Sequence, residues 1–432
     1  MDEAVFSFPQ GNPTIIKVIG VGGGGSNAVN HMYNEGIHDV SFVVCNTDNK
    51  ALQDSPVPTK LQLGLEGLGA GNRPDRAKAA TMESIEEVKR MLDDGSTKMV
   101  FVTAGMGGGT GTGAAPIIAK TAKDLGLLTV GIVTIPFKWE GKKKIDQALD
   151  GVDEISQNVD ALLVINNERL LDIYQDLTVI NAFAKADDTL CNAARSIAEI
   201  ITMHGIINLD FNDVKTTLKD GGVAIMSTGY GKGEGRVTAA IEDALNSPLL
   251  NNNDIYHSKK ILLLISFSSQ DESQSLMMDE MKEVTSFMEK VKNEDVETKW
   301  GLTVDQSLGE QIKVTILATG FGLKSVNTEE MDNYLSMHPI STDEQEAIDD
   351  KNEKAATRRG IYYGPDDSNK ASQRNYQCFT FNDEDLDNDE VISSVEATPT
   401  YGRTREKLKS LNTKKTEKIG IGNSGAAPVI SF

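Results

Sequence analysis

Apolar positions in the N-terminal part of the chain alternate between short β-branched runs and stretches with helical spacing. A short apolar, β-branched run is typical of a strand buried on both faces, whereas apolar residues recurring every three or four positions indicate a helix. These patterns predict strands at 15–20, 41–45, 98–103, 128–135 and 159–165, and helices at 26–35, 76–92 and 114–125. Alternating strands and helices favour a mostly parallel sheet that is covered by helices on both faces.

A longer helical pattern separates this region from a second, smaller one. Residues 181–203 carry an apolar stripe that includes Phe183, Leu190 and Ile197, which predicts a long central helix. Beyond it, strands are expected at 221–227, 260–267 and 312–319, with helices at 236–245 and 276–291. The chain is therefore expected to contain two α/β domains joined by one long helix.

From about residue 323 the apolar periodicity disappears. Stretches such as 341–346 and 381–390 are so polar that burial cannot offset the entropy of ordering the chain. We therefore expect a disordered acidic linker over 323–395, kept extended by its like charges, and a basic tail over 396–432. Residues 1–13 are expected to form a flexible leader.

The overall charge and the cysteine pattern exclude several classes of protein. The 432 residues carry a formal net charge of −21, whereas binding to nucleic acid through the overall field needs a basic surface. The N-terminus lacks the basic and apolar regions of a secretory signal, and the longest apolar runs are too short to cross a bilayer. The three cysteines are scattered and the five histidines lie far apart, so neither a disulfide framework nor a metal centre is expected.

A glycine-rich segment, Gly20-Val-Gly-Gly-Gly-Gly-Ser-Asn27, follows the first predicted strand and opens the first predicted helix. Glycine lets the backbone approach a phosphate closely, and a helix N-terminus directs free amide groups and the positive end of a dipole at it. The same segment fits the GxGxxG pattern of dinucleotide-binding folds, with Asp48 near the end of the next strand. This loop by itself is therefore compatible with an NAD-dependent oxidoreductase, which is the main alternative.

A second glycine loop, Gly107-Gly-Gly-Thr-Gly-Thr-Gly113, follows the third predicted strand and again precedes a helix. Five glycines and two hydroxyls in seven residues predict a second cradle lined by amide groups. A dinucleotide-binding fold uses one such loop, whereas two loops can hold the whole phosphate chain of a nucleoside triphosphate. The chain contains no GxxxxGK(S/T) sequence, so it is not a P-loop NTPase.

Four segments together resemble the tubulin/FtsZ family of GTPases, in register from about residue 15 to residue 322. The matching segments are 19–28 (first phosphate loop), 67–74 (γ-phosphate sensing), 107–113 (signature loop) and 136–144 (ribose contact). Within the first of them, Ser26 stands where glycine is common in the family. A match over this length, in order, is far more specific than either glycine loop alone.

The resemblance implies a tubulin-like α/β fold: a Rossmann-like N-terminal GTP-binding domain, a long central helix, a smaller α/β C-terminal domain, the disordered acidic linker and a short tail. The implied division is a flexible leader at 1–13, a GTP-binding domain at 14–180, a central helix at 181–204, a GTPase-activating domain at 205–322, the linker at 323–395 and a basic tail with an adaptor-binding peptide at 396–432.

The implied ligands are GTP or GDP, with Mg²⁺ bound to the nucleotide and no protein residue assigned to the metal. Guanine presents two hydrogen-bond donors on one edge, and Asp188 matches the acid that accepts them; the adjacent Asp187 is the alternative. Glu140 matches the acid that contacts ribose, and Lys144 replaces the usual arginine, which keeps the charge but loses the planar fork. The implied nucleotide contacts are Gly23, Gly24, Gly25, Ser26, Asn27, Ala70, Gly71, Gly107, Gly108, Gly109, Thr110, Gly111, Glu140, Lys144, Asn167, Phe183 and Asp188.

Hydrolysis needs a positioned water as well as a nucleotide cradle. Residues 208–213 follow the central helix and resemble the family's catalytic loop, with Asn208, Asp210 and Asp213 at its polar positions. From the residues alone, an acid or amide ahead of 214–218 is more typical of a helix cap. The resemblance implies that nucleotide and catalytic loop lie at opposite ends of the molecule, so that head-to-tail stacking completes the site and forms a filament.

The implied function is that of a cytoskeletal GTPase, which polymerises into the cell-division ring at the septum and recruits other division proteins. Its implied partners are further copies of the chain and membrane-tethered adaptors, which bind a tail peptide such as 399–405. A solvated basic tail, or its direct attraction to lipid, are alternatives for this segment. The implied location is the cytoplasmic face of the membrane at mid-cell. A scaffold that binds GTP without hydrolysing it is a further alternative.

Overall fold

The computed structural model describes residues 14–37, 39–173, 178–203, 205–246, 258–271, 274–291 and 296–321, with three short pieces at 355–356, 358–360 and 362–363. The chain divides into two compact units, Met1–Pro365 and Asp366–Phe432, and every described residue belongs to the first. The predicted leader, most of the predicted linker and the whole predicted tail lie outside the described residues.

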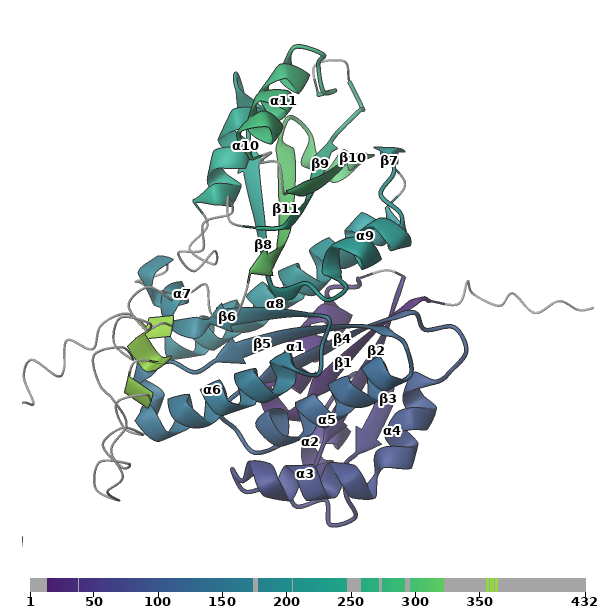
Figure 1. Cartoon of the computed structure of the whole chain (residues 1–432), viewed down its shortest axis with the longest axis vertical. Helices are drawn as coiled ribbons and strands as arrows, with labels where there is room; N and C mark the ends of the chain where they lie inside the picture. Colours follow the sequence, from purple (N-terminus) through teal and green to yellow (C-terminus); the bar gives the residue numbers. More distant parts are fainter. Residues whose placement is uncertain are drawn as a thin grey trace, which may run out of the picture. The chain divides into compact units, whose positions relative to one another are not determined.

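Strands of the described part form one eleven-stranded sheet in the order β3-β2-β1-β4-β5-β6-β8-β11-β9-β10-β7 (Figure 1). Neighbours from β3 to β8 in this order are parallel, and β11 is antiparallel to both of its neighbours. The strands are β1 (Ile16–Val21), β2 (Val40–Asn46), β3 (Thr59–Gln62), β4 (Met99–Gly105), β5 (Leu128–Ile135), β6 (Ala161–Asn166), β7 (Gly205–Ile207), β8 (Gly222–Gly231), β9 (Lys260–Phe267), β10 (Glu297–Val304) and β11 (Ile312–Phe321).

Helices connect these strands and pack on the sheet (Figure 1). They are α1 (Gly22–Asn34), α2 (Asn49–Gln53), α3 (Pro74–Glu83), α4 (Ile85–Leu92), α5 (Thr110–Asp124), α6 (Lys142–Ser156), α7 (Asn167–Ile173), α8 (Val179–Thr202), α9 (Phe211–Leu218), α10 (Arg236–Leu245) and α11 (Glu280–Val291). The predicted α/β class and the central helix, α8, are thereby confirmed.

The parallel part of the sheet is buried on both faces, because successive side chains of a strand point in opposite directions. In β1, Ile16 and Val18 belong to a core cluster that includes residues of α1 and α8. Ile19 and Val21 belong to a second cluster, which includes residues of α5 and α6. The first cluster also contains Leu262 and Leu317 of β9 and β11, so α8 shares one core with both parts of the sheet.

Each strand predicted from sequence is present, but three strands and one long helix were missed. The missed elements are β3, β7, β10 and α6, together with the short helices α2 and α7. The predicted single helix over 76–92 is wrong: α3 ends at Glu83 and α4 begins at Ile85. Between them Ser84 has φ −101° and ψ 19°, and its hydroxyl accepts a hydrogen bond of 2.9 Å from the Gly64 amide. The division between the two helices coincides with a contact that is distant in sequence.

The described pieces between residues 355 and 363 differ from the predicted linker. They are short helical segments, in yellow-green in Figure 1, and they pack against the N-terminal part of the sheet. Their arginine and tyrosine side chains find partners there, which a polar composition alone could not indicate.

Candidate functional site

The two glycine loops lie at the carboxyl ends of neighbouring parallel strands. β1 and β4 pair directly, and the strand order runs outward from them in both directions, to β2 on one side and to β5 on the other. Such a reversal opens a crevice at the carboxyl ends of the strands, where ligands bind in open α/β sheets. The sheet topology therefore brings together two loops that are eighty residues apart in the chain.

The first glycine loop is itself the first turn of a helix. α1 begins at Gly22, which has φ 73°, and not at residue 26 as the sequence pattern predicted. Val21 caps this helix without a side-chain hydrogen bond, so the first amides remain available to a ligand. A Cβ added at Gly22 would lie 2.7 Å from the amide nitrogen of Gly111, so the two loops touch.

The backbone of the second loop is closely packed at Gly109 and open at Gly108. A Cβ at Gly109 would lie 2.9 Å from both the Ala70 Cβ and the Arg73 nitrogen, whereas a Cβ at Gly108 would have no atom within 4 Å. α5 begins directly afterwards, again without a side-chain cap at Gly109. The Gln147 side chain donates to the carbonyl oxygens of Gly107 and Gly108 at 3.1 and 3.0 Å. Nothing in the sequence motifs pointed to Gln147.

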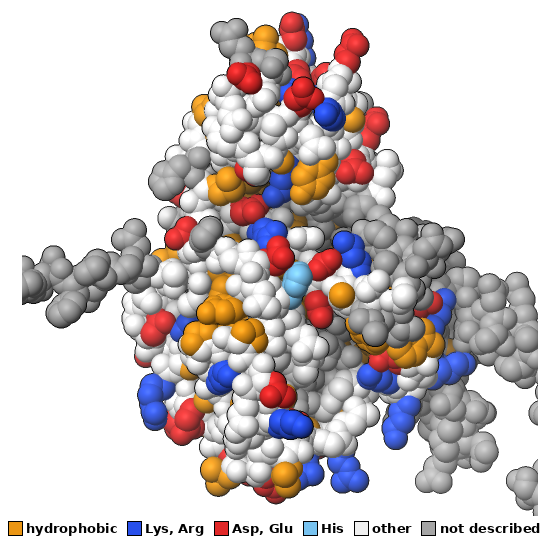
Figure 2. All heavy atoms as spheres, turned by 180° about the vertical axis from the view of Figure 1, so that it is seen from behind, with side chains coloured by type: hydrophobic (Ala, Val, Ile, Leu, Met, Phe, Trp, Pro, Cys, Tyr) orange, Lys and Arg blue, Asp and Glu red, His pale blue; other side chains and the backbone are white. Residues whose placement is uncertain are grey.

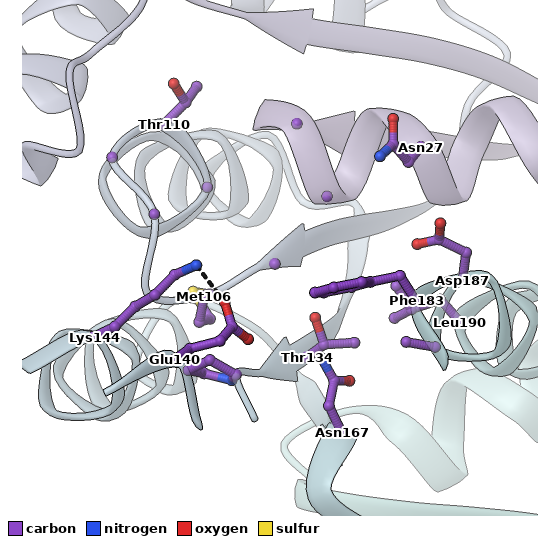
Figure 3. A pocket seen from close by; sticks show the side chains of 18 residues that line it. Asn27, Met106, Thr110, Thr134, Glu140, Lys144, Asn167, Phe183, Asp187 and Leu190 are labelled. Carbon is purple, nitrogen blue, oxygen red and sulfur yellow. Dashed lines mark hydrogen bonds and ion pairs between the residues drawn. The ribbon is translucent and has the colours of Figure 1, made fainter. Parts of the chain in front are cut away.

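A pocket of about 480 Å³ lies between these loops and α8 (Figure 3). Its wall contains most of the residues that the sequence motifs indicated: Gly23, Gly24, Asn27, Gly108, Gly109, Thr110, Gly111, Glu140, Lys144, Asn167 and Phe183. The wall also contains Asp187, the alternative acid, and six residues that the sequence did not indicate as contacts: Gly105, Met106, Thr134, Pro136, Ala186 and Leu190. Gly25, Ser26, Ala70, Gly71, Gly107 and Asp188 are not part of this wall.

A cation and a carboxylate form one side of the pocket. Lys144 Nζ donates to Glu140 Oε2 at 2.5 Å, and the other oxygen of Glu140 accepts from the Phe137 amide at 2.9 Å (Figure 3). Glu140 is largely buried and Lys144 is half-exposed. These two contacts fix the orientation of the carboxylate relative to the pocket.

Phe183 of α8 lines the pocket and belongs to a group of aromatic rings. Phe183 contacts Phe137 edge-on, with ring centroids 5.3 Å apart, and Trp139 at 5.9 Å. Phe183 is 40% exposed and Trp139 is 59% exposed, which is unusual for large apolar side chains. Figure 3 shows Phe183 directed into the pocket, so its ring offers a flat face to a bound base.

Two adjacent acids on α8 have different surroundings. Asp187 lines the pocket, and burial raises the pKa of its carboxyl from 3.8 to about 6. Asp188 instead pairs with His31 at 2.8 Å and with Lys185 at 3.2 Å. Figure 2, which shows the molecule from behind, contains a histidine flanked by acidic side chains. The pocket therefore contains the acid that the sequence left as the alternative.

Three buried polar atoms near the loops have no hydrogen-bond partner in the described structure. They are Ser26 Oγ of α1, Thr103 Oγ1 of β4, whose backbone lies beside Gly25, and Asn167 Oδ1 on the pocket wall. An unpaired buried polar atom costs about 1–3 kcal/mol, so such groups are rare unless they serve a ligand. Asn167 thus offers an acceptor to a donor group inside the pocket.

The predicted catalytic loop lies elsewhere. Asp210 and Asp213 form a reciprocal capping box at the start of α9, with bonds of 2.8 and 3.1 Å, and this confirms the capping interpretation. Lys299 donates to Asp213 at 2.9 Å, and this hydrogen bond is the largest cause of a lowered Asp213 pKa. Asn208 Oδ1 accepts from the Gly205 amide at 2.5 Å.

The length of α8 separates the catalytic loop from the pocket. Asp187 lines the pocket and lies in the N-terminal half of α8. The catalytic loop follows the other end of α8, at Thr202, and leads into α9 (Figure 1). At 1.5 Å per residue, the two positions are about 22 Å apart along the helix axis. Asn208, Asp210 and Asp213 are absent from the pocket wall. Within one described subunit, the loop cannot reach a ligand in the pocket.

The described residues hold neither a cluster of metal ligands nor a membrane-spanning helix. They contain no group of three or more histidine, cysteine, aspartate or glutamate side chains placed to hold a metal ion. None of their helices is long and apolar enough to cross a membrane.

Three family profiles match parts of the chain. Residues 15–175 match the GTPase domain of the Tubulin/FtsZ family, and residues 222–322 match the C-terminal domain of the FtsZ family. Residues 373–418 match a further FtsZ C-terminal region and lie outside the described part of the chain. The two larger matches cover most of the described sheet.

Full-length relatives show the same similarity. The chain is 51% identical over 415 residues to the cell division protein FtsZ of Porphyromonas gingivalis, which covers 94% of this chain and 89% of that protein. It is 43% identical over 314 residues to the cell division protein FtsZ of Aquifex aeolicus, covering 72% and 84%.

Solved structures share the fold. An FtsZ dimer from M. jannaschii superimposes with a TM-score of 0.65 and 37% identity, over 72% of this chain and 89% of that chain. A GTPγS-bound protofilament of CetZ2 from Haloferax volcanii superimposes with a TM-score of 0.57, over 74% of this chain and 97% of that chain. The second pair is only 18% identical, so it supports a common fold alone.

Proposed function

The chain belongs to the FtsZ cell-division GTPases of the tubulin/FtsZ family, and we propose that it binds GTP in the pocket between its two glycine loops. It is a GTPase of the kind that forms the cell-division ring. The observation that carries the assignment of the pocket is the convergence of two uncapped helix N-termini at the point where the strand order reverses. Each terminus supplies amide donors and a positive dipole end to the phosphates.

The polyphosphate lies against the open faces of the loops. Gly23 and Gly108 both line the pocket, and neither would place a Cβ near another atom, so the backbone is accessible at both. Lys144 adds the positive charge of its ammonium group near the same wall. We expect Gly25, Ser26, Ala70, Gly71 and Gly107 to support this cradle from behind, since they do not line the pocket.

The guanine base stacks on Phe183 and is read by an acid of α8. Guanine offers an N1–H and an amino group on one edge, and a carboxylate accepts both. Asp187 is the better candidate than Asp188, because it lines the pocket while Asp188 already pairs with His31 and Lys185. Asn167 supplies a further acceptor, and Glu140 is placed for the ribose hydroxyls.

Mg²⁺ is expected to bind with the nucleotide. The described residues contain no carboxylate cluster for it, which fits an ion held mainly by phosphate oxygens and water, as Mg²⁺ commonly is. When bound, it would neutralise phosphate charge. The chain's own contribution is to position the phosphates against amide donors.

Hydrolysis is completed by a second copy of the chain. The catalytic loop of one subunit, with Asn208, Asp210 and Asp213, is too far from its own pocket to act there. Head-to-tail stacking would bring it over the γ-phosphate of the neighbouring subunit. Such a contact does not close on itself, so it grows into a filament.

Exposed apolar side chains fit a contact of this kind. Leu65 and Leu68, between β3 and α3, are 90% and 82% exposed. They lie close in sequence to Ala70, which packs behind the second glycine loop. Ile206, directly before the catalytic loop, is 66% exposed. Apolar groups at both the pocket side and the loop side could bury one another in a filament.

Further partners and the location follow from the family. We propose that the tail, in particular 399–405, binds membrane-tethered division adaptors, and that the protein acts at the cytoplasmic face of the membrane at mid-cell. The tail lies outside the described residues, so this part rests on the family and on the sequence of the tail.

Three measurements on the purified protein test the proposal together. A thermal shift with GTP but none with NAD separates a GTPase from the oxidoreductase alternative. Phosphate release separates it from a scaffold that binds without hydrolysis. Light scattering that rises with GTP and falls as GDP accumulates links hydrolysis to assembly. Stabilisation by NAD alone would contradict the assignment of the pocket.

A further inference from the structure

A short segment that follows β11 in the chain packs against α6. We call the described residues between 355 and 363 the strap. Its partner surface is a row of three acids, Asp146, Asp150 and Asp153, which share one face of α6 because they are four and three residues apart. Arg358 and Arg359 of the strap pair with acids of this row. Tyr362 and Tyr363 pack against the core cluster that α6 helps to form.

The arginines pair with each acid of the row. Arg359 Nη1 donates to both carboxylate oxygens of Asp146 at 2.8 Å. Arg358 donates to Asp150 at 2.6 Å and to Asp153 at 2.8 Å. Burial raises the pKa of Asp153, as does the charge of Asp150, and Arg358 opposes both effects. The acids therefore repel one another less when the strap is bound.

The tyrosines extend the contact from α6 to the pocket. Tyr362 and Tyr363 pack against the core on the α6 side of the sheet, and burial raises the pKa of Tyr362 to about 12. The Tyr363 hydroxyl donates to the Pro136 carbonyl oxygen at 2.5 Å, and Pro136 lines the pocket. Asn166 Nδ2 donates to the Tyr362 carbonyl oxygen at 2.5 Å, directly before Asn167 on the pocket wall.

We propose that the strap is a peptide ligand of α6 within its own chain, and that its docking holds the Pro136 and Asn167 wall of the nucleotide pocket in place. Exposed ion pairs contribute little individually, so docking needs the arginines and the buried tyrosines together. Because binding linkage is reciprocal, a nucleotide that favours the ordered wall also favours the docked strap. The coupling to nucleotide rests on the proposed function, whereas the docking itself does not.

Limited trypsin digestion of the full chain tests this directly. Trypsin cuts after Arg358 and Arg359, so cleavage there reports release of the strap. GDP is the probe, because it fills the pocket without driving assembly. We expect GDP to slow cleavage at these two bonds about fivefold or more. Asp150→Ala with Asp153→Ala should speed cleavage about tenfold and weaken GDP binding.

Matched controls separate docking from general destabilisation. Glu86→Ala with Glu87→Ala removes two acids from α4 and should leave cleavage at both arginines unchanged. Cleavage after Arg403 and Arg405 should be equal in all variants. Tyr363→Phe keeps the ring but loses the hydroxyl, so it should weaken GDP binding with a smaller effect on cleavage.

Two results would overturn the inference. Equal cleavage at Arg358 and Arg359 in the wild type and in the Asp150 and Asp153 variant would refute the docked strap. Cleavage that depends on these acids but not on GDP would refute the coupling to the pocket. If GDP does not bind the wild type at all, the proposed nucleotide pocket is wrong. The cleavage rates of the wild type and of the Asp150 and Asp153 variant, both without nucleotide, then still test whether the strap docks on α6.

Discussion

Asp187 is subject to two opposing requirements. Burial at the pocket wall raises its pKa to about 6, so in the folded protein without nucleotide this acid keeps its proton up to a higher pH than an exposed aspartate does. Guanine binding requires the ionised form, because only a carboxylate without its proton accepts from both donors of the base. Selectivity for guanine is thus obtained at some expense of stability in the nucleotide-free protein, as at other functional sites.

Asp187→Asn separates the two requirements. The amide has no charge to desolvate, so the melting temperature without nucleotide should not fall. The amide nitrogen would face the donors of guanine, which costs on the order of 1–3 kcal/mol of binding, or roughly 5- to 150-fold in the dissociation constant. Titration of GTP against ATP in the variant measures the loss of preference.

Asp188→Asn is the matched control for this substitution, since Asp188 pairs with His31 and Lys185 outside the pocket wall. Its preference for GTP should stay near that of the wild type. A loss of preference in the Asp188 variant, with none in the Asp187 variant, would reassign the base contact to Asp188.

The raised pKa of Asp187 also predicts a pH dependence. Between the ordinary pKa of 3.8 and about 6, the folded state binds a proton more tightly than the unfolded state. The contribution of Asp187 to stability is therefore present at low pH and is lost as the pH rises through 6. Nucleotide affinity should change in the opposite direction and fall as the pH drops from 7 to 5. Since phosphate also titrates near pH 6, the measurement is the difference between wild type and Asp187→Asn, and parallel curves would contradict the assignment.

At the scale of elements, the phosphate cradle depends on the first turns of α1 and α5. Neither helix has a side-chain cap, so both leave amide donors directed at the pocket. The glycines of these turns have different roles. Gly109 packs against the backbone near Arg73, whereas Gly108 borders open space in the pocket.

Gly108→Ala should therefore weaken GTP binding without unfolding the protein. Its new methyl group would meet no protein atom within 4 Å but would occupy space near the phosphates. We expect at least a tenfold loss of GTP affinity, or about 1.4 kcal/mol, with an unchanged melting temperature in the absence of nucleotide. Gly109→Ala is the contrasting variant, because its Cβ would clash with Ala70 and Arg73 and should lower the melting temperature. Unchanged affinity in folded Gly108→Ala would exclude this loop from the site.

The start of α9 combines a structural role with the proposed catalytic one. Asp213 accepts from Lys299 and caps the helix together with Asp210, so its replacement by alanine would disturb both. Asp213→Asn keeps an oxygen that can accept the Asp210 amide, but it removes the charge and the oxygen that accepts from Lys299. Stability should change by less than about 1 kcal/mol, while GTP turnover should fall about 100-fold with GTP binding retained.

Asp305→Asn provides the control for Asp213→Asn. Asp305 also caps a short helix, through a 2.9 Å bond from the Ser307 amide, but it lies outside the catalytic loop. GTP turnover by the Asp305→Asn variant should equal that of the wild type. Equal turnover in the Asp213 variant would mean that the acid is only a helix cap.

At the scale of the whole molecule, pocket and catalytic loop belong to different ends of α8. In the proposed shared site, the free energy of filament contacts and the rate of hydrolysis are linked, because each complete site would exist only at a junction between subunits. Loss of the γ-phosphate would change the junction that surrounds it. The proposal thus makes assembly the step that activates the enzyme.

A mixture of two variants tests the shared site. Asp213→Asn keeps an intact pocket, and Gly108→Ala keeps an intact catalytic loop, so mixed junctions can be complete. The mixture should release more phosphate than the sum of the two variants measured alone, and wild-type turnover should rise more steeply than linearly with protein concentration. A strictly linear dependence, with no gain on mixing, would contradict hydrolysis at the junction.

The sequence by itself determined most of the strands, the central helix and the two glycine loops. These are local features, because β-branched runs, helical spacing and glycine act over a few residues. It also placed most residues of the pocket wall, through motifs that lie at strand-to-helix junctions. It could not separate Asp187 from Asp188, since two adjacent acids differ only in the direction that helix packing gives them.

Tertiary structure decided what depends on contacts distant in the chain. Ser84, where the predicted single helix divides into α3 and α4, accepts a hydrogen bond from the Gly64 amide, and Gln147 donates to the second glycine loop from a helix forty residues away. The strap is ordered because Arg358 and Tyr363 meet α6 and Pro136, although its flanking sequence resembles a disordered linker. In each case the burial and pairing that fix the residue come from partners which no local pattern specifies.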